Sequence, residues 1–420
     1  MKNVLVFSCG AIPAIDINIA LRGNKEYKVY GASSYDDHGL YIYENYIGGV
    51  PFISAPSFIS NFNEILRRYQ IDLIIPLHED MILFFQEHRD EIAATIVSSC
   101  YDTALLCRYK SKTYQALAGF DFVPIVYMEK DVDAYPVFVK KDDDQGARHA
   151  YKVENEAELR LYARQPDMII CEYLPGEEVT VDCFTDRHGA LRLVNPRAAD
   201  RILAGIDVHA RRLSHDEEIQ SIAERINTRI LFRGPWFFQI KRDQKGRFKL
   251  LEIATRFAGA FSLTRCMDLN TPLLALRDFD NKDVQFDYND IPIEADKMFI
   301  GRYSIANAYS RVVVDGVECL CIGECVDTFL MMFIYQCLNK RKPITLLCSD
   351  TQMAMQQLEE KHIATSVFST IFVSGNDNST VFEKAVFISR DEQRRIEVRE
   401  KYGICCYEPT AIEALLDWRG

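Results

Sequence analysis

Residues 236–256 carry side chains whose types and spacing could bind a metal ion. Two apolar runs flank the polar segment 243–246, which contains a glycine, and this pattern predicts a β-hairpin. With the turn centred near Lys245, Gln239 lies opposite Glu252. Side chains paired in this way across antiparallel strands have Cβ atoms about 4.5–5.5 Å apart. The hairpin would therefore present an amide oxygen and a carboxylate side by side.

Such a pair of oxygen ligands suits a hard cation such as Mg²⁺, or Mn²⁺ in its place. Mg²⁺ usually shares its protein ligands with the phosphates of a substrate. Arg256, two residues beyond Ala254, is a cation that could meet phosphoryl charge. The alternative is an amphipathic hairpin whose Glu252 is solvated at a sheet edge. The hairpin sequence alone leaves both interpretations open.

Length, composition and charge restrict the class of protein. A chain of 420 residues predicts two or three domains, and 48% apolar residues are ordinary for a globular protein. The net charge of −12 argues against general binding to nucleic acid or to a membrane surface, because both are anionic. No apolar run reaches the roughly 20 residues of a membrane span. The first residues predict a strand better than a signal peptide.

The thirteen cysteines include no Cys-x-x-Cys pair, so we expect reduced thiols in a cytoplasmic protein. A metal site at Cys319, Cys321 and Cys325 is a minor alternative, because no histidine accompanies them at ligand spacing. The cysteines that lie in apolar runs and are expected to be buried are Cys9, Cys100, Cys171, Cys183 and Cys337.

The N-terminal third predicts a parallel sheet, because apolar strands alternate with helical patterns. The predicted strands are 3–7, 27–30 and 71–76, and a helix is predicted over 58–69. His78-Glu79-Asp80 follows the last of these strands, where open α/β sheets bind ligands. The same three residues also suit the polar first turn of the next helix, and both interpretations stay open.

The middle of the chain offers groups that could bind a nucleotide. A basic helix predicted over 108–120 carries Lys110 and Lys112, and the strand 135–140 ends in Lys140. Farther on, Glu172 and Glu178 flank a segment whose backbone could meet a purine edge while a carboxylate meets ribose hydroxyls. Two solvated acids at a turn are the alternative.

Taken in order, these residues resemble the ATP-grasp superfamily, in its carbamoyl-phosphate-synthetase-like branch of carboxylate ligases, over roughly residues 1–300. The resemblance implies an α/β domain over 1–107 that precedes a two-lobed α+β ATP-grasp domain over 108–300. It implies ATP and Mg²⁺ (or Mn²⁺) as ligands. Gln239 and Glu252 match metal-ligand positions, while Arg256 and Lys140 match the residues beside the transferred phosphoryl group. The nucleotide-binding residues that the resemblance implies are Lys110 (with Lys112 as its neighbour), Lys140, Glu172, Tyr173, Leu174, Glu178 and Arg201, with Arg197 in the same arginine-bearing segment.

Three departures from the family pattern concern this site. The family usually has Glu-x-Asn-Pro-Arg, whereas this chain reads Glu252-Ile-Ala-Thr-Arg256, so Ala254 replaces an asparagine ligand. The small-residue phosphate loop is reduced to residues 145–149, and Lys141 stands where proline is common. Because Mg²⁺ habitually keeps several waters, one missing ligand predicts a weakened metal site.

The C-terminal residues 301–420 form a second α/β pattern that resembles the haloacid-dehalogenase (HAD-like) fold. Asp315 matches the nucleophile of that family, but Val317 occupies the position of its second aspartate. The resemblance implies a domain without phosphatase activity that serves packing, dimerisation or substrate delivery. The remaining positions matched to that family are Ser349 for its threonine or serine, Lys384 for its lysine, and Ser389 and Arg390, followed by Asp391, for its acidic pair.

The function that these resemblances imply is an ATP-dependent carboxylate–amine (or thiol) ligase that works through an acylphosphate. Its partners would be small-molecule carboxylates and amines, with no nucleic acid and no membrane, and a homodimer is the expected form of self-association. The alternative is an ATP-binding pseudoenzyme or scaffold that uses nucleotide to control partner binding.

Overall fold

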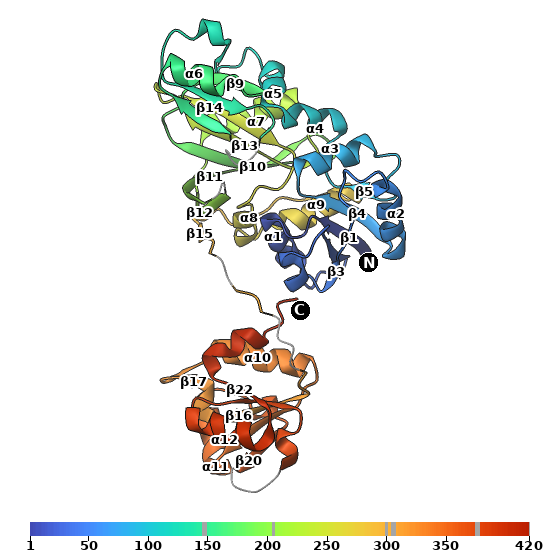
Figure 1. Cartoon of the computed structure of the whole chain (residues 1–420), viewed down its shortest axis with the longest axis vertical. Helices are drawn as coiled ribbons and strands as arrows, with labels where there is room; N and C mark the ends of the chain where they lie inside the picture. The colour runs from blue at the N-terminus through green and yellow to red at the C-terminus, as the bar shows by residue number, and fades with distance from the viewer. Residues whose placement is uncertain (145–148, 204–205, 299–300, 304–307, 374–378, 420) are drawn as a thin grey trace. The chain divides into compact units, whose positions relative to one another are not determined.

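The computed structural model describes residues 1–144, 149–203, 206–298, 301–303, 308–373 and 379–419 (Figure 1). The chain divides into two compact units, Met1–Phe299 and Ile300–Gly420. Both units combine helices with β-sheets, so the predicted mixed α/β class is confirmed. The predicted division of the first unit near residue 107 stays a prediction.

The first unit begins with a five-stranded parallel sheet, as its sequence pattern predicted. The strand order is β3-β2-β1-β4-β5, so the order reverses between β1 and β4. The strands are β1 (Lys2–Phe7), β2 (Tyr27–Ala32), β3 (Asn45–Ile47), β4 (Ile71–Pro76) and β5 (Thr95–Ile96). The helices of this part are α1 (Ile12–Leu21), η1 (His38–Tyr41), α2 (Phe58–Arg68) and α3 (Glu79–Glu87).

Alternate residues of β1 fill two separate cores, because successive side chains of a strand point to opposite faces. Phe7 packs with Phe58 and Phe62 of α2 and Phe85 of α3 on one face of the sheet. Val4 and Val6 face α1, and this second core includes apolar residues of 257–284. The parallel sheet is thereby packed directly against the C-terminal part of the first unit.

The helix predicted over 108–120 is present as the shorter α5 (Lys110–Ala116), and the extended Tyr109 separates it from α4 (Tyr101–Arg108). Tyr109 is extended, with φ −111° and ψ 119°. The backbone N–H of Lys110 donates to the Asp142 carbonyl at 3.2 Å, and Thr113 Oγ1 donates to the Leu106 carbonyl at 2.9 Å. These non-local and capping bonds replace the helical bonds that an uninterrupted helix would make.

A small four-stranded antiparallel sheet, with order β6-β9-β7-β8, follows these helices. Its elements are β6 (Val126–Tyr127), η2 (Glu129–Asp131), β7 (Val137–Lys141), β8 (Ala150–Val153), α6 (Glu156–Tyr162) and β9 (Met168–Glu172). β9 ends at Glu172, so this residue lies where the chain leaves the small sheet.

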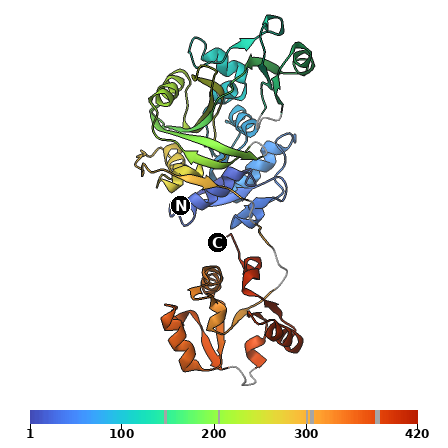
Figure 2. The same ribbon diagram turned by 90° about the vertical axis from the view of Figure 1, so that its left-hand side faces the viewer.

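A six-stranded antiparallel sheet, with order β14-β13-β10-β11-β12-β15, completes the first unit. Apolar residues of α7 pack on one face of it. Figures 1 and 2 show this sheet between the small sheet and the N-terminal parallel sheet. Its strands are β10 (Glu178–Thr185), β11 (Leu191–Leu203), β12 (Ile206–Arg212), β13 (Gly234–Arg242), β14 (Phe248–Ala254) and β15 (Glu294–Asp296). Its helices are α7 (Glu217–Arg229), α8 (Ser262–Cys266) and α9 (Thr271–Phe279).

The second unit is built on a parallel sheet with order β20-β19-β16-β21-β22. Its sheet strands are β16 (Arg311–Asp315), β19 (Ile344–Cys348), β20 (Thr370–Val373), β21 (Ala385–Ile388) and β22 (Cys405–Tyr407). A separate hairpin consists of β17 (Cys321–Ile322) and β18 (Cys325–Val326). The helices are α10 (Thr328–Asn339), α11 (Thr351–Glu360), α12 (Glu392–Tyr402), η3 (Val317–Leu320), η4 (Thr365–Val367), η5 (Ser379–Phe382) and η6 (Pro409–Leu415).

All thirteen cysteines are free thiols, in agreement with the sequence pattern. The expectation that Cys100 is buried is wrong, because this residue precedes α4 at an exposed position. Cys319 and Cys321 are buried whereas Cys325 is exposed. In the part of the chain that the structure describes, no three His, Cys, Asp or Glu residues are grouped as a metal site. Among the same residues, no helix is long and apolar enough to cross a membrane.

Candidate active site

The hairpin β13–β14 has the predicted register, with Gln239 directly paired to Glu252. The Gln239 side-chain N–H donates to Thr180 Oγ1 at 3.2 Å, so its amide oxygen is the atom available as a ligand. A register shift follows Gln239, between this residue and Ile240. The register is confirmed. The assignment of Gln239 and Glu252 as metal ligands stays a prediction.

Lys110, the first residue of α5, is turned toward this hairpin. Its Nζ lies 3.5 Å from Glu252 Oε2 and donates to the Asp144 carbonyl at 2.7 Å. The residue is 8% exposed. Lys112 is exposed and lies over the Tyr109 ring, 4.7 Å from its centroid. Of the two lysines considered for nucleotide binding, the structure therefore places Lys110 beside the hairpin.

Lys140, on β7, is buried in the same cluster. Its Nζ donates to Tyr114 Oη at 2.8 Å and to the Leu251 carbonyl at 3.0 Å, and Tyr114 Oη also donates to that carbonyl, at 2.7 Å. Burial lowers the pKa of Lys140, while the carboxylates of Glu252 and Glu178 act in the opposite direction. The bond network holds the ammonium between the small sheet and β14.

Arg256, just beyond β14, forms an ion pair with Glu79 of the N-terminal part. Arg256 Nη2 lies 3.3 Å from Glu79 Oε1, and the two side chains are 16% and 14% exposed. The buried Nε of Arg256 has no hydrogen-bond partner among the described residues. Glu79 is the first residue of α3. The segment 78–80 therefore forms the first turn of a helix and also lies at the edge of the sheet where a ligand was expected to bind.

The electrostatic surroundings of Glu79 include the metal-ligand candidate of the hairpin. Burial raises the pKa of Glu79, the positive charge of Arg256 opposes this shift, and the negative charge of Glu252 adds to it. Glu79 therefore interacts electrostatically with Glu252 of the hairpin, although the two residues are far apart in sequence.

The three residues predicted to face adenine connect the small sheet to the large one. Glu172 exchanges two bonds with Ile125: its backbone N–H donates to the Ile125 carbonyl, and its carboxylate accepts from the Ile125 N–H, both at 2.9 Å. Tyr173 lies against Lys152, whose Nζ is 4.8 Å from the ring centroid, and Leu174 is buried. The Glu172 side chain is thus held at the end of β9.

Glu178, the predicted ribose carboxylate, begins β10. Its Oε2 lies 3.4 Å from Lys241 Nζ on the neighbouring strand β13. Both side chains are partly exposed, at 27% and 31%. A ribose hydroxyl that bonds to Glu178 would therefore share this carboxylate with Lys241.

The two arginines of β11 occupy different surroundings. Arg197 is 1% exposed, and its Nε donates to Asp182 Oδ2 on β10 at 2.9 Å, which indicates a structural ion pair. Arg201 is 59% exposed and pairs with Asp296 on β15 at 2.6 Å. No hydrogen bond or ion pair joins Arg201 to the cluster around Glu252 within the described ranges. The structure therefore does not bring Arg201 together with the other nucleotide candidates.

The residues of the hairpin fit a hard cation with an incomplete protein ligand set. Ala254 is buried and pairs with Phe237, so it supplies no ligand in place of the expected asparagine. The Gln239 oxygen and the Glu252 carboxylate remain, and water can complete the coordination of Mg²⁺. The reduced phosphate loop at 145–148 lies outside the described residues; His149 pairs with Asp144 at 2.6 Å.

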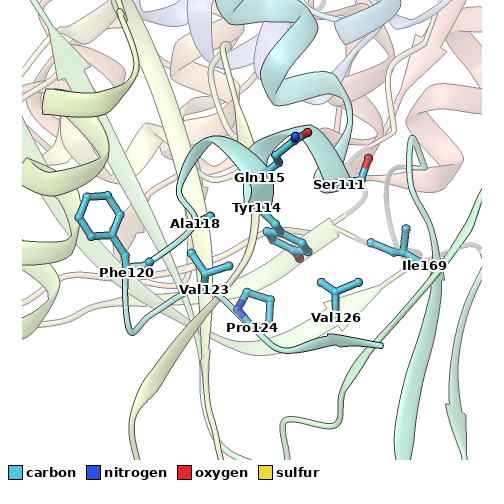
Figure 3. A pocket seen from close by; sticks show the side chains of 10 residues that line it. Ser111, Tyr114, Gln115, Ala118, Phe120, Val123, Pro124, Val126 and Ile169 are labelled. Atoms are coloured by element: carbon cyan, nitrogen blue, oxygen red, sulfur yellow. The ribbon is translucent and has the colours of Figure 1, made fainter. Parts of the chain in front are cut away.

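An apolar cavity of about 440 Å³ lies beside α5 (Figure 3). Ser111, Tyr114 and Gln115 contribute one wall, and the segment 118–126 with Ile169 of β9 contributes the rest. Tyr114 thus has its ring in the cavity wall and its hydroxyl in the Lys140 network. None of the predicted nucleotide or metal residues lines this cavity.

Two residues of the cluster were not identified from the sequence. Tyr114 lies four residues after Lys110, so helical spacing places both on one face of α5 and could have suggested the pairing. The carbonyl of Asp144, which accepts from Lys110, directly precedes the segment 145–149 that was matched to the phosphate loop. A backbone acceptor of this kind leaves no signal in side-chain types.

Three solved structures illustrate the proteins whose fold this chain resembles. Biotin carboxylase from Campylobacter jejuni, solved with βγ-ATP, is 16% identical, with 68% of this chain and 72% of that chain covered and a TM-score of 0.57. N5-carboxyaminoimidazole synthetase from Staphylococcus aureus, solved with ADP, is 14% identical, with coverage of 68% and 78% and a TM-score of 0.56. L-amino acid ligase from Bacillus licheniformis is 16% identical, with coverage of 66% and 74% and a TM-score of 0.53. At such identities these likenesses establish the fold alone.

The sequence itself matches one protein family over part of its length. Residues 164–296 match the family described as "ATP-grasp in the biosynthetic pathway with Ter operon". No curated protein matches the chain. The match supports an ATP-grasp domain in this part of the chain, whereas the HAD-like assignment of the second unit stays a prediction.

Proposed function

We propose that this protein is an ATP-dependent ligase that joins a carboxylate to an amine, or to a thiol, through an acylphosphate. The observation that carries the proposal is the pairing of Gln239 with Glu252 beside the buried lysines Lys110 and Lys140. Oxygen ligands next to cations are what a metal-bound triphosphate requires. The family match and the nucleotide-bound relatives support the same chemistry.

Each residue of the cluster has a role in this reaction. Gln239 and Glu252 would hold Mg²⁺ or Mn²⁺, which when bound supplies positive charge and fixes the geometry of the phosphates. Lys110 and Lys140 bind phosphate oxygens, and Arg256 offsets charge on the γ-phosphoryl group as it is transferred. The backbone of 172–174 binds adenine, and Glu178 binds ribose.

The reaction has two steps in which the protein positions groups and no protein nucleophile is needed. A substrate carboxylate oxygen attacks the γ-phosphorus, the bond to the ADP oxygen breaks, and an acylphosphate and ADP result. The neutral amine nitrogen then attacks the acyl carbon and the bond from this carbon to the phosphate oxygen breaks. The nitrogen loses one proton to the leaving phosphate, so that an amide and hydrogen phosphate result. Positioning of the reacting groups is the main contribution expected from the protein.

The direct test is ADP release with Mg²⁺ across a panel of the twenty amino acids. We expect release above background with at least one amino acid or pair of amino acids. The Glu252→Gln variant should lose this release, whereas Glu217→Gln, an exposed residue of α7, should keep it. Equal ADP release by wild type and Glu252→Gln in every well would contradict the proposal.

A second candidate is an ATP-binding protein without ligase activity that uses nucleotide to control partner binding. Ala254 favours it, because the ligand usual at this position is missing. Tight nucleotide binding in equilibrium dialysis, together with no amino-acid-dependent ADP release, is the result expected for this candidate.

For the second unit we propose a HAD-like domain without phosphatase activity. The parallel strand order supports this, as does Asp315 at the end of the central strand, where its Oδ2 accepts from Ser389 Oγ at 2.8 Å. Arg394 Nε lies 3.9 Å from Asp315, and the second aspartate position is the buried Val317. Mg²⁺-dependent hydrolysis of p-nitrophenyl phosphate by the full chain that Asp315→Asn abolishes would refute this.

We further propose a cytoplasmic location and small-molecule substrates, consistent with the free thiols and the acidic charge. Dimerisation is one role open to the second unit. Sedimentation equilibrium of the full chain measures the mass directly, and a mass of one chain at all concentrations would exclude the dimer.

A further inference from the structure

We propose that Glu79 is the residue that binds the amino group of the nucleophilic substrate. This inference rests on the proposed ligase function and names the class of acceptor, a small molecule with a primary amine that is cationic in solution. The carboxylate of Glu79 would accept hydrogen bonds from the ammonium group and hold it beside Arg256.

The position of Glu79 in the fold is that of a ligand-binding residue. It begins α3, three residues after the end of β4, at the carboxyl edge of the parallel sheet. The strand order reverses between β1 and β4, and crevices at such a reversal are where open α/β sheets bind ligands. The carboxylate of Glu79 therefore reaches the site at the hairpin from the N-terminal sheet.

The contact with Arg256 places Glu79 at the reacting end of the nucleotide site. Arg256 Nη2 lies 3.3 Å from the Glu79 carboxylate, and neither side chain is more than 16% exposed. Arg256 is also the residue that would meet the transferred phosphoryl group. A substrate group bound to Glu79 is thus next to the place where the acylphosphate forms.

The charges of the site favour an ammonium group as the ligand of Glu79. When a phosphoryl group binds to Arg256, the positive charge of this arginine is divided between the phosphoryl oxygens and Glu79. A mostly buried carboxylate is costly unless positive charge offsets it. An incoming ammonium adds to the positive charges of Arg108 and Lys110 that act on Glu79. After the ammonium gives one proton to the Glu79 carboxylate, its neutral nitrogen can attack the acyl carbon.

Hydroxylamine separates amine binding from acylphosphate formation, because it is a small neutral nucleophile that traps an acylphosphate as a hydroxamate. With ATP, Mg²⁺ and the amino-acid panel, wild type should yield a hydroxamate. The Glu79→Gln variant should yield a similar amount, while its KM for the amine substrate rises about 10- to 100-fold, as expected for loss of a hydrogen bond to a charged group. The KM for ATP and the requirement for Mg²⁺ should not change.

A matched control is Glu87→Gln, the exposed last residue of α3, which should leave all these values unchanged. The Glu79→Asp variant retains the charge and should recover part of the amine affinity. Intact nucleotide affinity shows that each variant is folded.

Three outcomes would overturn the inference. An unchanged KM for the amine in Glu79→Gln would show that Glu79 does not bind the amine. A parallel loss of hydroxamate would show that Glu79 acts by positioning Arg256, and a raised Mg²⁺ requirement would assign it to the metal. Absence of both ADP release and hydroxamate in wild type would instead refute the proposed function, and this inference with it.

Discussion

Lys110 Nζ lies 3.5 Å from Glu252 Oε2, so a lysine predicted to bind phosphate is paired with a carboxylate predicted to bind a metal. The two side chains are 10% and 26% exposed, which keeps the pair partly shielded from water. Binding of a metal–nucleotide complex would exchange this contact for two others, lysine to phosphate and carboxylate to metal. Without nucleotide, the lysine and the carboxylate therefore offset each other's charge.

Lys110→Met should weaken ATP binding, because the methionine keeps the buried stem and removes the charge. We expect a loss of about 10- to 100-fold in affinity, the size of one charge-assisted hydrogen bond. Lys112→Met is the matched control, since Lys112 is two residues away and exposed. Titration with a fluorescent ATP analogue measures both variants. A larger loss for Lys112→Met would show that the assignment of these two lysines is reversed.

Tyr114→Phe should loosen Lys140 without removing its charge. The hydroxyl accepts from Lys140 at 2.8 Å and donates to the Leu251 carbonyl at 2.7 Å, and Tyr114 is buried. We expect a loss of about 1 kcal/mol in the free energy of unfolding, a typical value for one hydrogen bond, and weaker ATP binding. Tyr35→Phe, whose ring is 63% exposed, should change neither quantity. Urea denaturation and nucleotide titration test the two effects separately.

The pKa of Glu79 predicts how the stability of the first unit depends on pH. Burial raises this pKa above the ordinary value of 4.5, so the folded state binds the proton more tightly than the unfolded state. The stabilisation due to protonation is complete below the unfolded-state pKa and is lost as the pH rises through the folded-state pKa. Relative to Glu79→Gln, the wild type should therefore lose stability as the pH rises from about 4.5 toward neutrality.

Urea denaturation followed by tryptophan fluorescence can measure this difference. The chain has two tryptophans, Trp236 in the first unit and Trp418 in the second. With Trp418→Phe in both proteins, the buried Trp236 reports on the first unit alone. A difference that stays constant with pH, or that changes with the opposite sign, would contradict a raised pKa at Glu79.

Arg197 should matter for stability, whereas Arg201 should not. Arg197 is buried beside Asp182, and removal of one partner of a buried ion pair costs about 3–5 kcal/mol. Arg197→Met should therefore lower the free energy of unfolding strongly in the same Trp236 assay. Arg201→Met removes an exposed pair with Asp296 and should leave the unfolding midpoint unchanged. Equal effects of the two substitutions would contradict this distinction.

Local sequence patterns determined the regular elements and the register of the hairpin. The strand Ile71–Pro76 begins and ends where the apolar run and its flanking residues predicted. Gln239 pairs with Glu252 because a short turn leaves few ways to align two strands, and a slip by one residue would expose the apolar face. These features depend on neighbours in sequence, so the sequence alone contains them.

Only the tertiary structure decided which distant side chains meet. The helix break at Tyr109 depends on the bond from Lys110 to the Asp142 carbonyl, and the burial of Arg197 depends on β10 lying beside β11. The ion pair between Arg256 and Glu79 forms because the segment that follows β14 packs with the N-terminal sheet in one core. Such contacts follow from how whole elements pack, and no periodicity within a single segment encodes that arrangement.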